Sequence, residues 1–108
     1  MPAALPVTLP ITLLVIARNE APIIARCLDS VPFAAEKIVI DSGSTDGTPE
    51  VAARHGARVV HQNWRGFGPQ RNFGSTQASH DWILALDADE ALSAELADEM
   101  QRRLPQLM

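Results

Sequence analysis

The sequence of 108 residues predicts an α/β fold in which helices cover both faces of a parallel sheet. Two observations support this prediction. Apolar, strand-like runs alternate with helix-like segments over short connections, which is typical of right-handed βαβ units. The first run, residues 11–17, is continuously apolar and rich in β-branched side chains, as expected of a strand that is covered on both faces.

The segment after this first strand has the features of a helix start. Asn19 can cap a helix, and Pro22 is tolerated in its first turn. Apolar residues then recur on one helix face, and Cys27 belongs to that face. Cys27 is therefore interpreted as a small core residue rather than a nucleophile. As the chain's single cysteine, it excludes an internal disulfide and fits a reducing compartment.

Strand and helix signals alternate along the rest of the chain. Strands are marked by short apolar runs, and helix boundaries by proline in the first turn and glycine after the last. The predicted elements are a strand over 37–41, a helix from Thr48 and Pro49 to a stop at Gly56, a strand over 57–61, a loop over 62–68, a helix from Pro69 to about Ser79, a strand over 82–86, and a helix capped by Ser93.

Residues 1–17 carry no charged side chain, which raises the question of a leader or a membrane span. A signal peptide has positive charge before its apolar stretch, and a span needs about 20 apolar residues. Pro2, Pro6 and Pro10 interrupt the run. A buried strand over residues 11–17 is the better interpretation.

Charge and motif content exclude several classes of protein. The formal net charge is −4, so the chain has no basic excess to hold nucleic acid. No G-x-G-x-x-G sequence follows the first strand and no P-loop is present, which argues against a dinucleotide enzyme and a P-loop NTPase. The three histidines show no metal-ligand spacing.

An acidic cluster, residues 87–90, directly follows the fourth predicted strand. In an extended segment residues two apart point the same way, so the carboxylates of Asp87 and Asp89 could face one site. Their mutual repulsion is relieved by a cation, and hard oxygen ligands suit Mg²⁺ or Mn²⁺. The same residues could also form a solvated acidic loop at a helix start.

A second polar cluster, residues 41–46, follows the second strand. The Asp41 carboxylate could accept hydrogen bonds from a ribose hydroxyl or a base N–H. Gly43 permits positive φ and close approach of a ligand. Asp46 and Thr48 are interpreted as turn and helix-cap residues.

Two further clusters follow the first and third strands. The backbone of Ala17, Arg18 and Asn19 could frame a nucleoside, while Glu20 is explained by the helix dipole alone. Arg71 could reach a base or a diphosphate. The nearby Trp64 and Phe67 could form a stacking platform, but packing over a neighbouring core is preferred. Because the carboxyl ends of parallel strands meet at one edge, the clusters after strands one, two and four should gather there.

Taken together, these motifs resemble family 2 glycosyltransferases, which have the GT-A fold with a Rossmann-like N-terminal half. The residues that carry the resemblance are Ala-Arg-Asn-Glu at 17–20, Asp-Ser-Gly-Ser-Thr-Asp-Gly-Thr at 41–48, Gly-x-x-Arg-Asn at 68–72, and Asp-Ala-Asp at 87–89. Residues 64–72 are also similar to a subgroup that adds glucose to the lipopolysaccharide inner core.

The resemblance implies a role for each cluster. Residues 17–20, Asp41 and Gly43 would hold the nucleoside, and Arg71 would lie near the nucleotide. Asp87 and Asp89 would form a DxD motif that binds Mg²⁺ or Mn²⁺, with Asp89 the closer ligand and Asp87 also on the substrate side. The implied reaction transfers a sugar from a nucleotide diphosphate sugar, UDP-sugar above all, to a glycan or glycolipid hydroxyl with inversion.

The resemblance covers residues 11–92 and implies a nucleotide-sugar-binding domain over 1–108, with the acceptor half and the general base outside it. A cytoplasmic location, at the inner face of the membrane and with peripheral membrane association of the full-length protein, is expected. Two alternatives stay open. One is a non-catalytic nucleotide-binding fragment. The other is an aspartate-nucleophile phosphatase, against which Glu90 and Ala91 count, since a Gly-Thr or Gly-Val pair is expected there.

Overall fold

A computed structural model describes residues 8–108 of the chain. Its four strands form one parallel sheet in the order β3-β2-β1-β4, which confirms the predicted fold class. Residues 1–7, which include two of the prolines discussed above, lie outside the described part. The elements are β1 (Leu9–Ala17), α1 (Ala21–Asp29), β2 (Ala34–Asp41), α2 (Thr48–Arg54), β3 (Arg58–His61), α3 (Phe67–Gln77), β4 (Trp82–Asp87), α4 (Ala94–Arg103) and a 3₁₀ turn (Leu104–Gln106).

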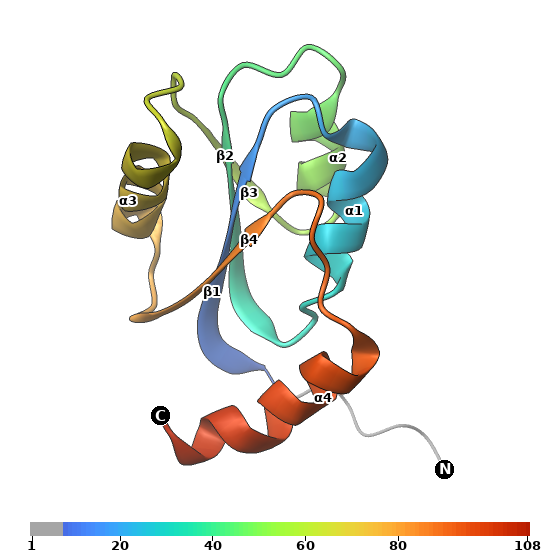
Figure 1. Ribbon diagram of the computed structural model, residues 1–108, viewed down its shortest axis with the longest axis vertical. Helices are drawn as coiled ribbons and strands as arrows, with labels where there is room; N and C mark the ends of the chain where they lie inside the picture. The colour runs from blue at the N-terminus through green and yellow to red at the C-terminus, as the bar shows by residue number, and fades with distance from the viewer. Residues whose placement is uncertain (1–7) are drawn as a thin grey trace.

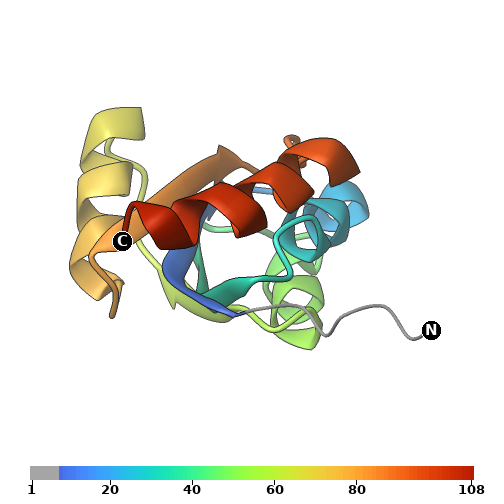
Figure 2. The ribbon, with the colours of Figure 1, turned by 90° about the horizontal axis from the view of Figure 1, so that it is seen from below.

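Helices cover both faces of the sheet (Figure 1). Helices α1 and α2 lie on one face and α3 on the other, while α4 lies across the end where the strands begin (Figures 1 and 2). Within residues 8–108, no helix is both long and apolar enough to cross a membrane.

Most element boundaries agree with the predictions, and the differences have simple causes. Strands β1 and β2 each begin earlier than predicted, because their first residues pair with one another from Leu9 and Ala34 onward. Helix α3 begins at Phe67 rather than Pro69, with Gly66 at a φ of 102° before it. Ser93 caps α4 as predicted: its Oγ accepts a hydrogen bond from the backbone N of Leu96 at 3.1 Å.

The buried strands give the sheet two apolar faces. Leu13 and Val15 of β1 point into a large core with α1, while Leu14 lies with Ile38 and Ile40 on the α3 face. This alternation follows from the period of two along a strand. Cys27 is 1% exposed in the larger core, and burial, followed by the charges of nearby acidic residues, raises its pKa to about 11. The prediction of a core cysteine is therefore confirmed.

Helix α3 packs closely on β1 at Gly74. A Cβ added at Gly74 would lie 2.5 Å from Cδ1 of Leu14, which is 2% exposed and has little room to move. At Gly68, in the same helix, an added Cβ meets nothing within 4 Å. These two glycines form a matched pair.

We expect Gly74→Ala to lower the free energy of unfolding by about 1–3 kcal/mol, because overpacking a filled core forces neighbours off their preferred rotamers. Gly68→Ala should be neutral or stabilise by up to about 1 kcal/mol through helix propensity. Urea unfolding of both variants checks this. A stabilised Gly74→Ala variant would show that α3 does not rest on the sheet at this position.

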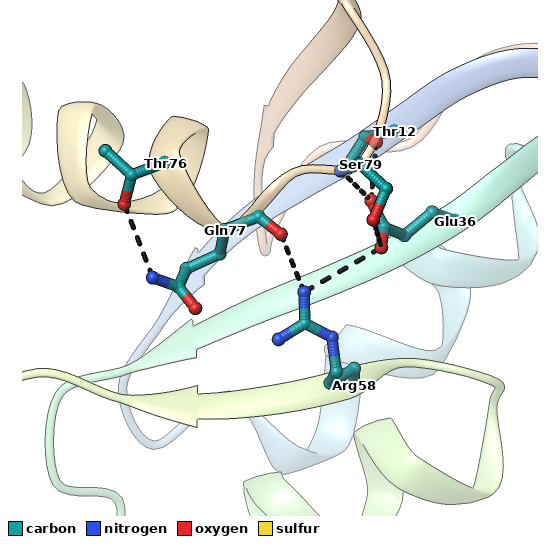
Figure 3. A network of polar contacts seen from close by, with 6 residues as sticks. All are labelled: Thr12, Glu36, Arg58, Thr76, Gln77 and Ser79. Atoms are coloured by element: carbon teal, nitrogen blue, oxygen red, sulfur yellow. Dashed lines mark hydrogen bonds and ion pairs between the residues drawn. The ribbon is translucent and has the colours of Figure 1, made fainter.

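A polar network ties the end of α3 to the starts of the strands (Figure 3). The Glu36 carboxylate accepts hydrogen bonds from the Thr12 hydroxyl at 2.7 Å and from the backbone N and hydroxyl of Ser79 at 2.8 and 2.9 Å. Arg58 lies 3.7 Å from it and also donates to the Gln77 carbonyl at 2.7 Å. Desolvation raises the pKa of Glu36, but these hydrogen bonds and the Arg58 charge outweigh it, so the pKa is lowered.

This lowered pKa makes the stability of the fold depend on pH. The ionised Glu36 contributes stability in full above its unfolded pKa of about 4.3, and the contribution is lost as pH falls through the lower folded pKa. Glu36→Gln should lower the free energy of unfolding by about 1–3 kcal/mol at pH 7. The variant should also lose less stability than the unaltered protein as the pH falls. Unfolding titrations from pH 7 to pH 3 test it, and parallel pH profiles for the two proteins would contradict it.

Candidate active site at the carboxyl edge of the sheet

The register of the sheet brings the polar loops together. Ala17 at the end of β1 pairs with Asp41 at the end of β2, and Ile16 pairs with Asp87 at the end of β4. The segments that follow these three strands therefore leave the sheet at one edge, as predicted. In parallel sheets this edge is where ligands bind.

The loops after β1 and β2 are joined through Asn19. Its backbone N donates to Oγ of Ser44 at 2.8 Å, and its Oδ1 accepts from the backbone N of Thr45 at 2.8 Å. Asn19 has a φ of 54°, a left-handed conformation that Asn tolerates better than most residues. The prediction that Asn19 caps the first helix is wrong, because its side chain is used across the loops instead.

Backbone N–H groups at the start of α1 donate hydrogen bonds to side chains that follow β2. The backbone N of Ala21 donates to Oδ2 of Asp46 at 3.1 Å, and the backbone N of Glu20 donates to the Thr48 hydroxyl at 2.9 Å. Asp46 also accepts from the backbone N of Thr48 at 3.1 Å, and the hydrogen bonds that Asp46 receives, that of the Thr48 hydroxyl first, lower its pKa. Asp46 and Thr48 thus act as turn and helix-cap residues, as predicted. Their hydrogen bonds also join the loops after β1 and β2.

Asp41 organises the turn that follows β2. Its side chain is buried, and its Oδ2 accepts from the backbone N of Gly43 at 3.0 Å and of Ser44 at 2.9 Å. Its Oδ1 accepts from the Ser44 hydroxyl. Gly43 has a φ of 109°, and no atom lies within 4 Å of the place where its Cβ would be. A carboxylate oxygen can accept two hydrogen bonds, so Oδ1 retains capacity for one ligand donor.

The acidic segment after β4 is a tight turn rather than an extended strand. Strand β4 ends at Asp87, and the backbone N of Glu90 donates to the Asp87 carbonyl at 2.9 Å. Ala88 is 4% exposed, whereas Asp87 and Asp89 are both exposed. The extended-strand reason for placing the two carboxylates on one side therefore fails, but both side chains are accessible at the same edge.

Asp87 and Asp89 fit a hard divalent cation that has part of its shell supplied from elsewhere. Within residues 8–108 no cluster of three or more His, Cys, Asp or Glu side chains could enclose a metal. Mg²⁺ commonly takes one or two protein carboxylates and completes its shell with water and substrate phosphates. Two exposed carboxylates at the carboxyl edge of the sheet match this donor set.

Arg71 lies beside this acidic turn. Its Nη2 is 3.7 Å from Oδ1 of Asp87, and its guanidinium carbon is 5.9 Å from the centre of the Phe67 ring. Both partners of the ion pair are about half exposed, so the pair adds little stability. The arrangement places a planar cation with several N–H donors next to the carboxylates.

A cavity of about 260 Å³ opens at the same edge. Because Ile16 lines it and also pairs with Asp87, the cavity lies next to the acidic turn. The residues that line it come from the ends of β1 and β2 and from the segment before and at the start of α3: Ile16, Ala17, Arg18, Glu20, Ser42, Trp64 and Phe67.

The residues that line the cavity correct the interpretation of Trp64 and Phe67. Trp64 and Phe67 do not pack over a core, since they are 47% and 60% exposed and line the cavity. Glu20, one of the residues for which the family resemblance implies contact with the nucleoside, also lines it. Ser42 and Ser44 were not singled out, because a serine next to a glycine in a polar cluster is typical of an ordinary turn. Their only sequence signal is their place directly after a buried strand.

A parallel sheet with polar loops and a cavity at its carboxyl edge defines an α/β protein that binds its ligand at the strand ends. The chain belongs to glycosyl transferase family 2, whose family model matches residues 12–106. The resemblance seen in the motifs is therefore confirmed.

Individual relatives agree with this assignment. An uncharacterized glycosyltransferase of Rickettsia bellii is 47% identical over 92 residues, covering 84% of this chain and 31% of the relative. The lipopolysaccharide core biosynthesis glycosyltransferase LpsC of Rhizobium meliloti is 33% identical over 105 residues, covering 93% of this chain and 37% of LpsC. The chain thus spans about a third of the length of such relatives.

Solved structures confirm the GT-A fold. Glucosyl-3-phosphoglycerate synthase from Mycobacterium tuberculosis, in complex with Mn²⁺, UDP and glucosyl-3-phosphoglycerate, has a TM-score of 0.66 and 29% identity, covering 75% of this chain and 35% of that one. Mannosyl-3-phosphoglycerate synthase from Rubrobacter xylanophilus has a TM-score of 0.68 and 25% identity, covering 81% and 32%.

Proposed function

We propose that this chain is the donor-binding part of an enzyme that transfers a sugar from a UDP-sugar to a hydroxyl acceptor, with Mg²⁺ or Mn²⁺ as cofactor. Membership of glycosyl transferase family 2 supports sugar transfer. The similar synthase from Mycobacterium tuberculosis has been crystallised with UDP and either Mn²⁺ or Mg²⁺. Similarity to LpsC supports a role in lipopolysaccharide or cell-envelope glycan synthesis.

The observation that carries this proposal is the position of the cavity at the end of β1, whose two neighbouring strands are followed by different kinds of loop. On one side the cavity is lined by Ala17, Arg18 and Ser42, from the joined loops after β1 and β2. On the other side of β1, the register places Asp87 beside Ile16. A nucleoside in the cavity would therefore have its diphosphate directed toward the exposed carboxylates.

Each residue has a defined task in the proposed reaction. Residues 17–20, Asp41 and Gly43 frame the nucleoside, and Arg71 offers N–H donors to diphosphate oxygens. Asp87 and Asp89 would hold the metal, which when bound supplies Lewis-acid neutralisation of the leaving diphosphate. No residue among 8–108 is assigned as the general base that inversion at the anomeric carbon requires.

We propose no acceptor site among residues 8–108. A glycan or glycolipid acceptor and the general base would be held outside the matched third of the relatives. We further propose that the protein acts in the cytoplasm at the inner face of the membrane, in peripheral association with it. This follows from the proposed acceptor, because a glycolipid is held in a membrane.

The direct test is calorimetric titration of the protein with UDP in the presence of Mn²⁺, of Mg²⁺ or of a chelator. We expect UDP to bind, and more tightly with either metal, because a cation held by Asp87 and Asp89 would supply positive charge to neutralise the diphosphate. Equal affinity with the chelator would exclude the metal role. Binding without release of UDP from UDP-sugar would instead favour the non-catalytic alternative. Neither the family match nor the similar structures support the phosphatase alternative.

A further inference from the structure

Trp64 and Phe67 are exposed aromatic side chains that line the cavity at the carboxyl edge of the sheet. Phe33 is fully buried, whereas Trp64 and Phe67 are 47% and 60% exposed. They contact each other edge to face, with ring centroids 4.9 Å apart and an interplanar angle of 88°. Exposed aromatic rings that line a cavity lack the burial that normally explains their presence in a sequence.

The segment that carries this aromatic pair is anchored at several points. The backbone N of Gln62 donates to the Asp41 carbonyl at 3.0 Å, which fixes the segment to the end of β2. Gln70 is fully buried, and its Nε2 donates to the Gln62 carbonyl at 3.2 Å. The Arg71 guanidinium lies over the Phe67 ring. The rings therefore form a positioned wall, and little ordering is needed when a ligand arrives.

The opposite side of the cavity is chemically different from this wall. Ala17, Arg18, Glu20 and Ser42 supply backbone groups and polar side chains but no aromatic surface. The wall meets the acidic turn through Arg71, whose guanidinium carbon is 5.9 Å from the centre of the Phe67 ring and whose Nη2 is 3.7 Å from Oδ1 of Asp87. A nucleotide with its diphosphate at Arg71 and the acidic turn would have its base within reach of the cavity that the wall lines.

We infer that Trp64, braced by Phe67, is the stacking partner of the donor's base and a determinant of nucleotide affinity. The inference rests on the proposed function, since it requires a nucleotide in the cavity. Every nucleobase has a π face, and stacking on an aromatic side chain contributes strongly to binding. The cavity of about 260 Å³ has room for a nucleobase beside the wall.

Tryptophan fluorescence offers a direct readout, because the chain has only two tryptophans. Trp82 lies at the start of β4, at the opposite end of the sheet from the cavity. In Trp82→Phe, the remaining Trp64 should be quenched by UDP with Mn²⁺. In Trp64→Phe, the remaining Trp82 should not respond. The reverse pattern, or quenching in neither variant while calorimetry reports UDP binding, would overturn the inference.

Affinity measurements give the second test. Trp64→Ala should weaken UDP binding by about 5- to 150-fold, the range expected for loss of one stacked base. Binding of Mn²⁺-pyrophosphate, which has no base, should not change, and Trp82→Ala should bind UDP normally. An unchanged UDP affinity, or an equal loss for pyrophosphate, would contradict the stacking role. If the unaltered protein binds no nucleotide at all, the proposed function itself fails and this inference with it.

Discussion

Asp89→Ala is expected to abolish the metal-dependent part of nucleotide binding while leaving the fold as stable as before, or slightly more stable. Within residues 8–108, Asp89 takes part in no hydrogen bond or ion pair that its removal could cost. The helix that follows is capped by Ser93 instead. In the absence of metal, Asp89 adds only repulsion to Asp87 and Glu90, and its removal relieves that repulsion.

Two measurements on the same variant separate a metal ligand from a structural residue. UDP titrations with and without Mn²⁺ should give one affinity, equal to that of the unaltered protein with chelator. Thermal melts without metal should show no loss of stability. Asp81→Ala is the matched control, because Asp81 is an exposed aspartate next to the other end of β4. A structural Asp89 would do the reverse, with a loss of about 0.5–2 kcal/mol, as for a lost cap, and intact binding.

The arrangement of the sheet could be predicted from the sequence because its causes are local. Apolar runs such as residues 37–41 have the length and composition of buried strands, and the Thr48-Pro49 pair marks a helix start within a few residues. Alternation of such segments leaves few topologies once right-handed crossovers are required. The polar clusters could then be placed at one edge, because the carboxyl ends of parallel strands lie on the same side of the sheet.

The contacts within the site could not be predicted in the same way, because they join residues far apart in the sequence. Asn19 has every local feature of a helix cap, yet its partners are Ser44 and Thr45 in another loop. The amide oxygen of Asn can accept a hydrogen bond in either arrangement, and the pairing of β1 with β2 brings the loop that holds Ser44 and Thr45 within its reach. The position of Asn19 in the loop therefore predicted a structural role for its side chain, but not its hydrogen-bond partners.

The prediction that the two aromatic side chains pack over a core was wrong for a related reason. Trp64 and Phe67 are apolar, so burial is the default expectation for both. Whether a neighbouring core has room for them depends on how the segment after β3 is anchored, and Gln70, a polar residue buried completely under that segment, determines this. A buried glutamine has no signature in the helical pattern, so the exposed wall became visible only in the structure.

Asp41→Asn is expected to weaken both the fold and nucleotide binding. The substitution keeps the size of the side chain but leaves one carbonyl oxygen for the two backbone N–H groups of Gly43 and Ser44, and turns a donor toward the Ser44 hydroxyl. That hydroxyl already accepts from the backbone N of Asn19, so its proton is left without its partner. Impairing hydrogen bonds to a buried charged group should lower the free energy of unfolding by about 1–3 kcal/mol.

The effect on binding tests whether the Asp41 carboxylate touches the nucleoside or only shapes the turn. If Oδ1 accepts a ribose hydroxyl or a base N–H, UDP affinity should fall by about 5- to 150-fold in Asp41→Asn. Ser44→Ala is the control, because it removes the hydroxyl from the same turn and leaves the carboxylate in place. We expect Ser44→Ala to lose stability but to retain most of its affinity for UDP. Equal losses of affinity in the two variants would mean that Asp41 acts through the turn, since the only feature the two changes share is the hydrogen bond between these side chains.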